Sequence, residues 1–94
     1  MPTYIRLVNL TEQAVRNVSK IGDMIAEARK VFEANGCRLI QSWSTLGLYD
    51  LVAVVDGPND ATMMKVSALI ARQGNFRAVT LPAVTTADFA ASVK

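Results

Sequence analysis

The chain has 94 residues, enough for one domain with a single core, and we expect one domain over residues 1–94. Hydrophobic residues make up 51% and charged residues 19%, an apolar excess that favours self-association. Ten basic and eight acidic residues leave a net charge of +2 with no block of like charge, which gives little support for a nucleic-acid or membrane partner.

Histidine is absent, which excludes a Ser-His-Asp triad, a histidine base and histidine-ligated haem or zinc. The single cysteine, Cys37, excludes an internal disulfide. We therefore expect no metal and no cofactor. The start of the chain lacks a signal-peptide pattern, and no window approaches the roughly 20 apolar residues of a membrane span. The expected location is cytoplasmic, with no membrane partner.

Residues 3–10 are expected to form a strand, because β-compatible residues lie between Pro2 and Thr11. Alternation puts Ile5 and Leu7 on a purely apolar face and Arg6 on the opposite, mixed face. Thr11 can then cap a helix.

Helix is expected over residues 12–35, with a break near residues 19–23, where Gly22 costs about 1 kcal/mol relative to alanine. Asn35-Gly36 is a suitable C-terminal stop. One apolar stripe runs along the second half of this segment: Ile21, Ile25, Ala28 and Phe32.

Residues 37–45 and 48–56 are expected to be strands joined by a tight turn at Leu46-Gly47, where glycine supplies a positive φ. Residues 51–55 form an apolar run without alternation, which is typical of a central strand buried on both faces.

Residues 57–60 form a turn that ends in a helix cap, and we expect the next helix over residues 61–73. Residues 76–83 give a fourth strand, placed at an edge because Pro82 cannot donate to a ladder. The tail, residues 86–94, can form one or two helical turns.

This order predicts an α+β, ferredoxin-like βαββαβ fold with a four-stranded antiparallel sheet ordered 4-1-3-2 and two helices on one face. The uncovered face carries either Val52 and Val54 or Leu51, Ala53 and Val55. Either set leaves an apolar patch larger than monomers usually expose. We therefore predict that two sheets pair face to face in a homodimer.

Several segments resemble the GYD-domain family, and the resemblance extends over roughly residues 1–90. The signature is a glycine followed, after a spacer, by Tyr-Asp. Thr45-Leu46-Gly47-Leu48-Tyr49-Asp50 resembles this signature, and three further segments also resemble the family: Met1-Pro2-Thr3-Tyr4, residues 51–55 and residues 74–77. The family is largely uncharacterised and is similar to the dimeric α+β barrels. That resemblance implies relatives among ligand binders, cofactor-free oxygenases and isomerases, and haem proteins that mostly use a histidine absent here.

The topology brings polar and aromatic candidates to one end of the sheet: Asn9, Trp43, Tyr49, Asp50 and Arg77. Asp50 is either a general base or ligand anchor, or a carboxylate that accepts backbone N–H bonds at the turn. In the functional interpretation Tyr49 donates a hydrogen bond to a substrate oxygen and Trp43 stacks on a ligand ring. In the structural interpretation the two aromatic side chains pack against each other across the strands. Arg77 is an ion-pair partner or an anion ligand.

Arg6 lies mid-strand on the mixed face, so its guanidinium reaches a dimer interface or an enclosed cavity. Once buried, it needs a carboxylate or a ligand anion to offset its desolvation.

Three functions stay open at this point. The first is a homo-oligomeric domain that binds a small apolar or aromatic acid. The second is a cofactor-free isomerase or oxygenase that uses Asp50 and Tyr49. The third is a structural or interaction module. RNA binding is rejected because residues 51–55 lack the aromatics that RNA-recognition strands present.

Overall fold

The computed structural model describes all 94 residues. Its sheet has four antiparallel strands in the order β2-β3-β1-β4, which confirms the predicted ferredoxin-like arrangement. The central strands are β1 and β3, and β4, which contains Pro82, lies at an edge. The elements follow in the order β1 Thr3–Leu10, α1 Glu12–Arg16, a 3-10 turn at Val18–Lys20, α2 Ile21–Ala34, β2 Arg38–Ser44, β3 Leu51–Asp56, α3 Asp60–Arg72, β4 Phe76–Ala83 and α4 Thr86–Ser92.

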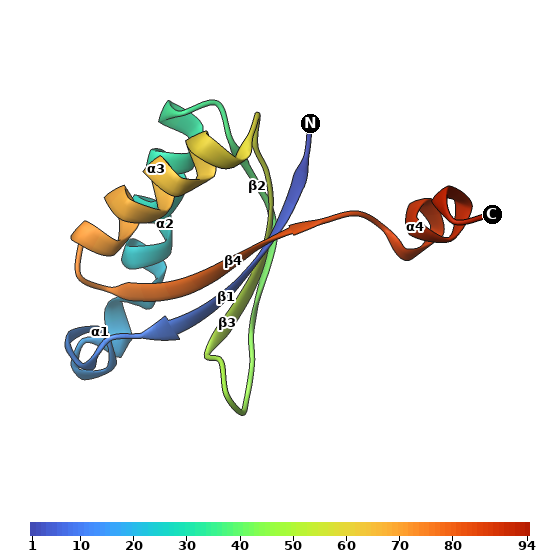
Figure 1. Cartoon of the computed structure of the whole chain (residues 1–94). Helices are drawn as coiled ribbons and strands as arrows, with labels where there is room; N and C mark the ends of the chain where they lie inside the picture. Colours follow the sequence, from blue (N-terminus) through green and yellow to red (C-terminus); the bar gives the residue numbers. More distant parts are fainter.

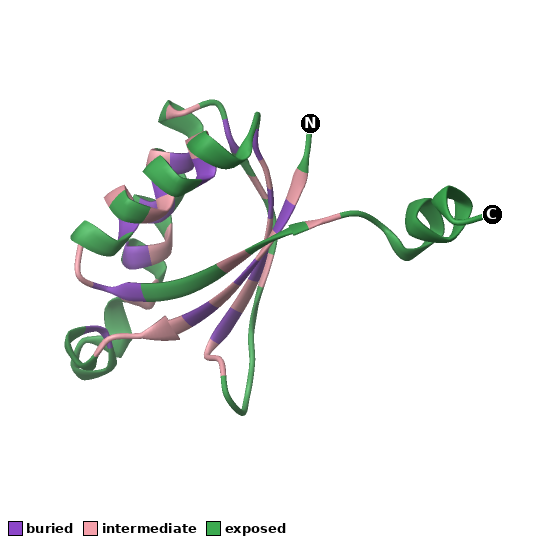
Figure 2. Ribbon diagram, in the orientation of Figure 1, coloured by how far each residue is buried: buried purple, intermediate pink, exposed green.

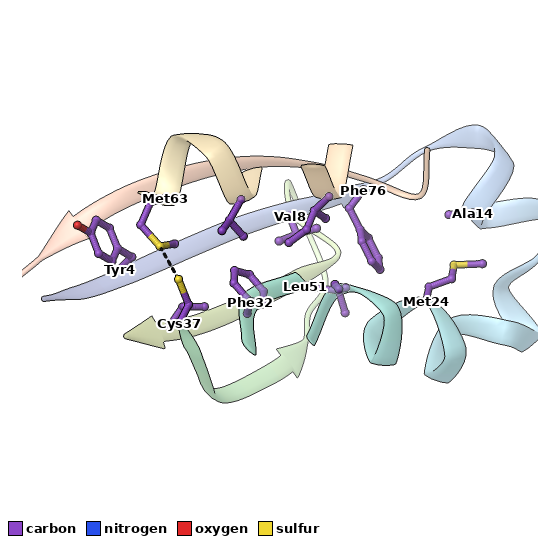
Figure 3. Packing of buried hydrophobic residues seen from close by; sticks show 13 residues of the cluster. Tyr4, Val8, Ala14, Met24, Phe32, Cys37, Leu51, Met63 and Phe76 are labelled. Atoms are coloured by element: carbon purple, nitrogen blue, oxygen red, sulfur yellow. Dashed lines mark hydrogen bonds between the residues drawn. The ribbon is translucent and has the colours of Figure 1, made fainter. Parts of the chain in front are cut away.

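Helices α2 and α3 cover one face of the sheet, and the other face stays open (Figure 1). A cluster of 13 buried residues fills the space between sheet and helices (Figure 3). Phe32 projects from α2, while Met63 and Ile70 project from α3. Both helices are amphipathic, and their apolar stripes supply the helix side of this core.

The break in the helical region lies earlier in the chain than the position predicted from Gly22. Thr11 caps α1 through a bond from Ala14 N to its Oγ1 (3.2 Å), as expected. The chain then leaves the α-helix at Asn17, and Gly22 falls inside the first turn of α2. Asn17, whose side chain donates to Gln13 O (2.9 Å), ends the first helix by satisfying a terminal carbonyl.

The connection between β2 and β3 differs from the tight turn at Leu46-Gly47, and that prediction was wrong. Strand β3 begins only at Leu51, so residues 45–50 form a six-residue loop. Gly47 does have a positive φ of 107°. The loop closes where Thr45 N donates to Asp50 O (2.9 Å). Asp50 N also donates to Val8 O of β1 (2.9 Å), so the end of the loop is held against both neighbouring strands.

The last helix, α4, stands away from the rest of the chain on the open side of the sheet (Figure 1). Thr85 caps it through a bond from Asp88 N (3.0 Å). Every residue of α4 is exposed, including Phe89 at 59% (Figure 2). No helix of the structure combines the length and the apolar character that a membrane crossing needs.

Candidate functional site

The open face carries two complete rows of side chains across all four strands. Cross-strand partners share a face, so the pairings assign each row. The first row is Trp43, Val52, Leu7 and Val79, and the second is Gln41, Val54, Ile5 and Leu81. All but Gln41 are apolar, and we call these two rows the open face. Trp43 and Val79 are 51% and 49% exposed.

Polar residues border the open face at both ends. At one end Asn9 pairs with Arg77. At the other end Asp56 accepts from Thr3 Oγ1 (3.2 Å) and forms an ion pair with Arg38 (3.8 Å). An apolar patch with a polar rim is the usual composition of a protein interaction surface.

The five candidate site residues predicted from the sequence do lie at one end of the sheet, but their side chains are not gathered in one place. Asn9 and Arg77 are cross-strand neighbours on β1 and β4. Trp43 is on β2, the opposite edge strand, which is three strand spacings or about 14 Å from β4. A ligand role for these three residues stays a prediction.

Asp50 ties the β2–β3 loop to β1. Its Oδ2 accepts from Leu10 N (2.9 Å), and its own backbone N donates to Val8 O (2.9 Å). The carboxylate thus bonds to a neighbouring strand and not to turn amides. Tyr49 beside it is half-buried, and its carbonyl accepts from Thr45 Oγ1 (2.6 Å). Their roles as base and donor stay predictions.

Arg6 faces the helices and lines an apolar pocket. Of the two positions expected for its guanidinium, a dimer interface or an enclosed cavity, it therefore takes the cavity. The residue is 3% exposed. Its Nη1 donates to Ser67 Oγ (2.8 Å) and Thr80 Oγ1 (2.9 Å), and its Cζ lies 5.4 Å from the centroid of the Phe32 ring. Burial lowers the pKa of the guanidinium.

Alternation along β1 identified Arg6 as a candidate residue, but it did not identify the two hydroxyls that accept its hydrogen bonds. Thr80 lies opposite Arg6 on β4, and alternation along that strand could have placed it under the helices. Ser67 follows Met63 by four positions, so helical periodicity also puts it on the buried stripe of α3.

Two other buried groups have shifted pKa values. Tyr4 donates to Asp60 Oδ1 (2.7 Å), and this hydrogen bond, together with burial, raises the pKa of Tyr4 to about 12. Burial also raises the pKa of the Cys37 thiol. The Cys37 Sγ lies 3.8 Å from Met63 Sδ in the core (Figure 3). Neither group contributes a reactive anion at neutral pH.

Comparison with known proteins gives the family. The GYD domain model matches residues 4–93. The chain belongs to the GYD domain family. A relative from Thermus thermophilus, "Glutamine synthetase and cystathionine beta-lyase binding protein", is 33% identical over 95 residues and aligns over 100% of both chains.

A solved structure shares the fold of this GYD-domain chain. The crystal structure of FFRP-DM1 superposes with a TM-score of 0.60 at 16% identity, covering 89% of this chain and 100% of that one. At this identity the likeness shows the fold alone.

Proposed function

We propose that this GYD-domain chain is a protein-binding module that acts as a homodimer, with the open faces of two copies packed against each other as in a dimeric α+β barrel. The open face is the observation that carries the proposal. It is continuous over two rows and four strands, has a polar rim, and is apolar at every position but Gln41. A second copy presents the same surface, so a two-fold arrangement covers both at once.

The area available explains why α4 belongs to the interface. Four strands about 4.8 Å apart and eight residues at about 3.4 Å each give a flat area of about 500 Å². A stable interface buries about 800 Å² per partner. Helix α4 extends on the open side of the sheet (Figure 1), and both Phe89 and Val93, the residue that follows the helix, are exposed. Its apolar side chains supply the missing area.

The partner protein is proposed from the relative. A protein 33% identical along its whole length is named for binding two enzymes, glutamine synthetase and cystathionine beta-lyase. We propose the same class of partner, a metabolic enzyme, for this chain. The location proposed is the cytoplasm, where an unpaired cysteine such as Cys37 is ordinary.

Sedimentation velocity from 1 to 200 µM tests the homodimer. We expect the wild type to sediment as a dimer and Val52→Asp to sediment as a monomer, because two carboxylates per interface lose their water. The matched control is Val15→Asp, which replaces an exposed valine of α1 and leaves the dimer intact. A wild type that stays monomeric at 200 µM overturns the homodimer.

Truncation after Val84 tests the part played by α4. Because every residue of α4 is exposed, we expect the truncated protein to keep its fold by circular dichroism and to dimerise at least tenfold more weakly. An unchanged dimer dissociation constant removes α4 from the interface.

Binding of purified enzymes tests the partner. Glutamine synthetase and cystathionine beta-lyase from the source organism are titrated over the immobilised full chain by interferometry, with an unrelated oligomeric enzyme as control. We expect saturable binding of at least one of the two, with a dissociation constant in the micromolar range or below. If neither binds above the control, the partner class is wrong, whereas the dimer stands or falls by sedimentation.

A further inference from the structure

Arg6 is a buried cation without an anion. The two ion pairs of the chain, Arg16–Glu12 and Arg38–Asp56, lie elsewhere, so no carboxylate comes within 4.0 Å of this guanidinium. Its hydrogen-bond partners, Ser67 and Thr80, are neutral hydroxyls. Buried charges in proteins are normally paired, because neutral partners do not repay the loss of water.

Donors on Arg6 also remain free. A guanidinium has five N–H groups in a planar fork, and both of its hydrogen bonds come from Nη1. Nη2 and Nε bond to nothing in the chain. These two nitrogens form the edge that binds a carboxylate in bidentate fashion.

An apolar pocket of about 50 Å³ adjoins Arg6, between the sheet and α2. Nine of its eleven lining residues are hydrophobic, and the two polar ones are Arg6 and Ser42. Both belong to one row of the sheet, because Ala53 pairs with each of them. Ile25, Ala28 and Phe32 of α2 form the opposite wall.

The composition of the pocket decides the class of anion. A water molecule occupies about 10–15 Å³ on this scale, so the pocket holds about three to five non-hydrogen atoms. Phosphate or sulfate has four oxygens, and most of them would face aliphatic side chains without a donor. A carboxylate with a short alkyl chain presents two oxygens to one guanidinium edge and carbon to the rest.

We propose that the pocket binds a short-chain monocarboxylate, of acetate to propionate size, with its carboxylate on Nη2 and Nε of Arg6 and its alkyl chain against α2. Ser42, whose hydroxyl makes no hydrogen bond within the chain, lies in the same row as a further donor. This site is independent of the homodimer and of the enzyme partner.

Amide NMR of the wild-type chain in chloride-free buffer tests the site. Formate, acetate, propionate, butyrate and hexanoate are titrated, with propionamide as the uncharged analogue of propionate. We expect saturable shifts at Arg6 and Ala28 and an affinity that rises about fourfold per methylene group up to propionate. Butyrate and hexanoate bind more weakly, because their chains exceed the pocket, and propionamide produces no saturable shift.

Three variants separate the charge from the cavity. Arg6→Met removes the cation and is expected to abolish carboxylate binding. Ala28→Leu fills the pocket, keeps the cation and is also expected to abolish it. Arg29→Met removes an exposed arginine next to the pocket wall and is expected to leave binding unchanged.

The proposal is overturned if no carboxylate gives saturable shifts on the wild type below about 50 mM, which corresponds to about 2 kcal/mol of binding free energy. This test uses the wild type alone, so it does not depend on whether a variant folds. The proposal is also overturned if propionamide binds as well as propionate, or if sodium chloride alone reproduces the shifts. Binding that survives Ala28→Leu with the fold intact places the carboxylate outside this pocket and overturns it as well.

Discussion

The two faces of the sheet differ in the polarity of their middle rows. The face under α2 and α3 carries Arg6 and Thr80 in its middle row, whereas the face without helices is apolar except at Gln41. A monomer gains nothing from an exposed apolar face, and it loses stability from a buried arginine without a counter-ion. This difference supports the two proposals, that the open face serves assembly and that the covered face binds a carboxylate at its polar row.

The largest expected effect compares neighbouring valines on opposite faces. Val55 is fully buried under the helices, and Val54 lies on the open face. We expect Val55→Ala to lower the free energy of unfolding by about 2 kcal/mol at every protein concentration. Val54→Ala should cost less in dilute protein and more as concentration rises, because the proposed dimer buries this partly buried side chain further. Urea unfolding at 1 and 200 µM measures both, and equal, concentration-independent costs would contradict the two-face comparison.

Asp50 joins the loop beyond the open face to β1. Asp50→Ala leaves the partly buried Leu10 N–H without its acceptor, and we expect a loss of about 1–2 kcal/mol in the free energy of unfolding. Asp50→Asn keeps an oxygen there and should cost less. Glu27→Ala, an exposed carboxylate on α2, is the control. Wild-type stability in Asp50→Ala would remove the structural role and favour a ligand role.

Arg6→Met tests whether the covered face keeps its cation for stability. We expect the free energy of unfolding to rise by about 1 kcal/mol, because the desolvated charge disappears and a hydrophobic side chain of similar length fills the site. Ser67 and Thr80 retain each other as partners, since their oxygens are 3.4 Å apart. Denaturant unfolding in chloride-free buffer measures the change. A loss of about 3 kcal/mol or more, the cost of breaking a needed buried pair, would make Arg6 structural.

The smallest effect is a pH dependence at Tyr4, at the end of the covered face. Its pKa is raised to about 12 in the folded chain from 10.0, so its contribution is complete below pH 10. Between pH 10 and about 12 the unfolded chain loses this proton first, and stability falls. The wild type minus Tyr4→Phe difference in urea unfolding, from pH 8 to 11.5, isolates the effect from lysine titration. Parallel curves for the two proteins would show that the bond to Asp60 does not shift the pKa.

Local chemistry explains which elements could be predicted. Thr11 and Asn59 are side-chain caps whose positions fix the starts of α1 and α3. Gly36 and Gly74 have positive φ angles that mark the helix ends. The β2–β3 connection escaped prediction because its length depends on Asp50, whose bonds go to β1, far away in sequence.

The candidate site shows the same division. Alternation along β1 placed Arg6 on the face opposite Ile5 and Leu7. It could not say which of the two faces the helices cover, because both are largely apolar along β3. The partners of Arg6 come from α3 and β4, 61 and 74 residues further along the chain.

Residue order alone was enough to establish the succession of strands and helices, the central place of β3, the edge position of Pro82 and the membership of one family. The elements and their places follow from side-chain periodicity, caps and backbone constraints, which act over a few residues, whereas the family follows from the resemblance of several segments to its members. The packed chain was needed to show that Val52 and Val54 are on the uncovered face, that α4 stands free, and that Arg6 is buried without a carboxylate. These depend on which face the helices cover, and the packing free energy of the whole chain sets that choice.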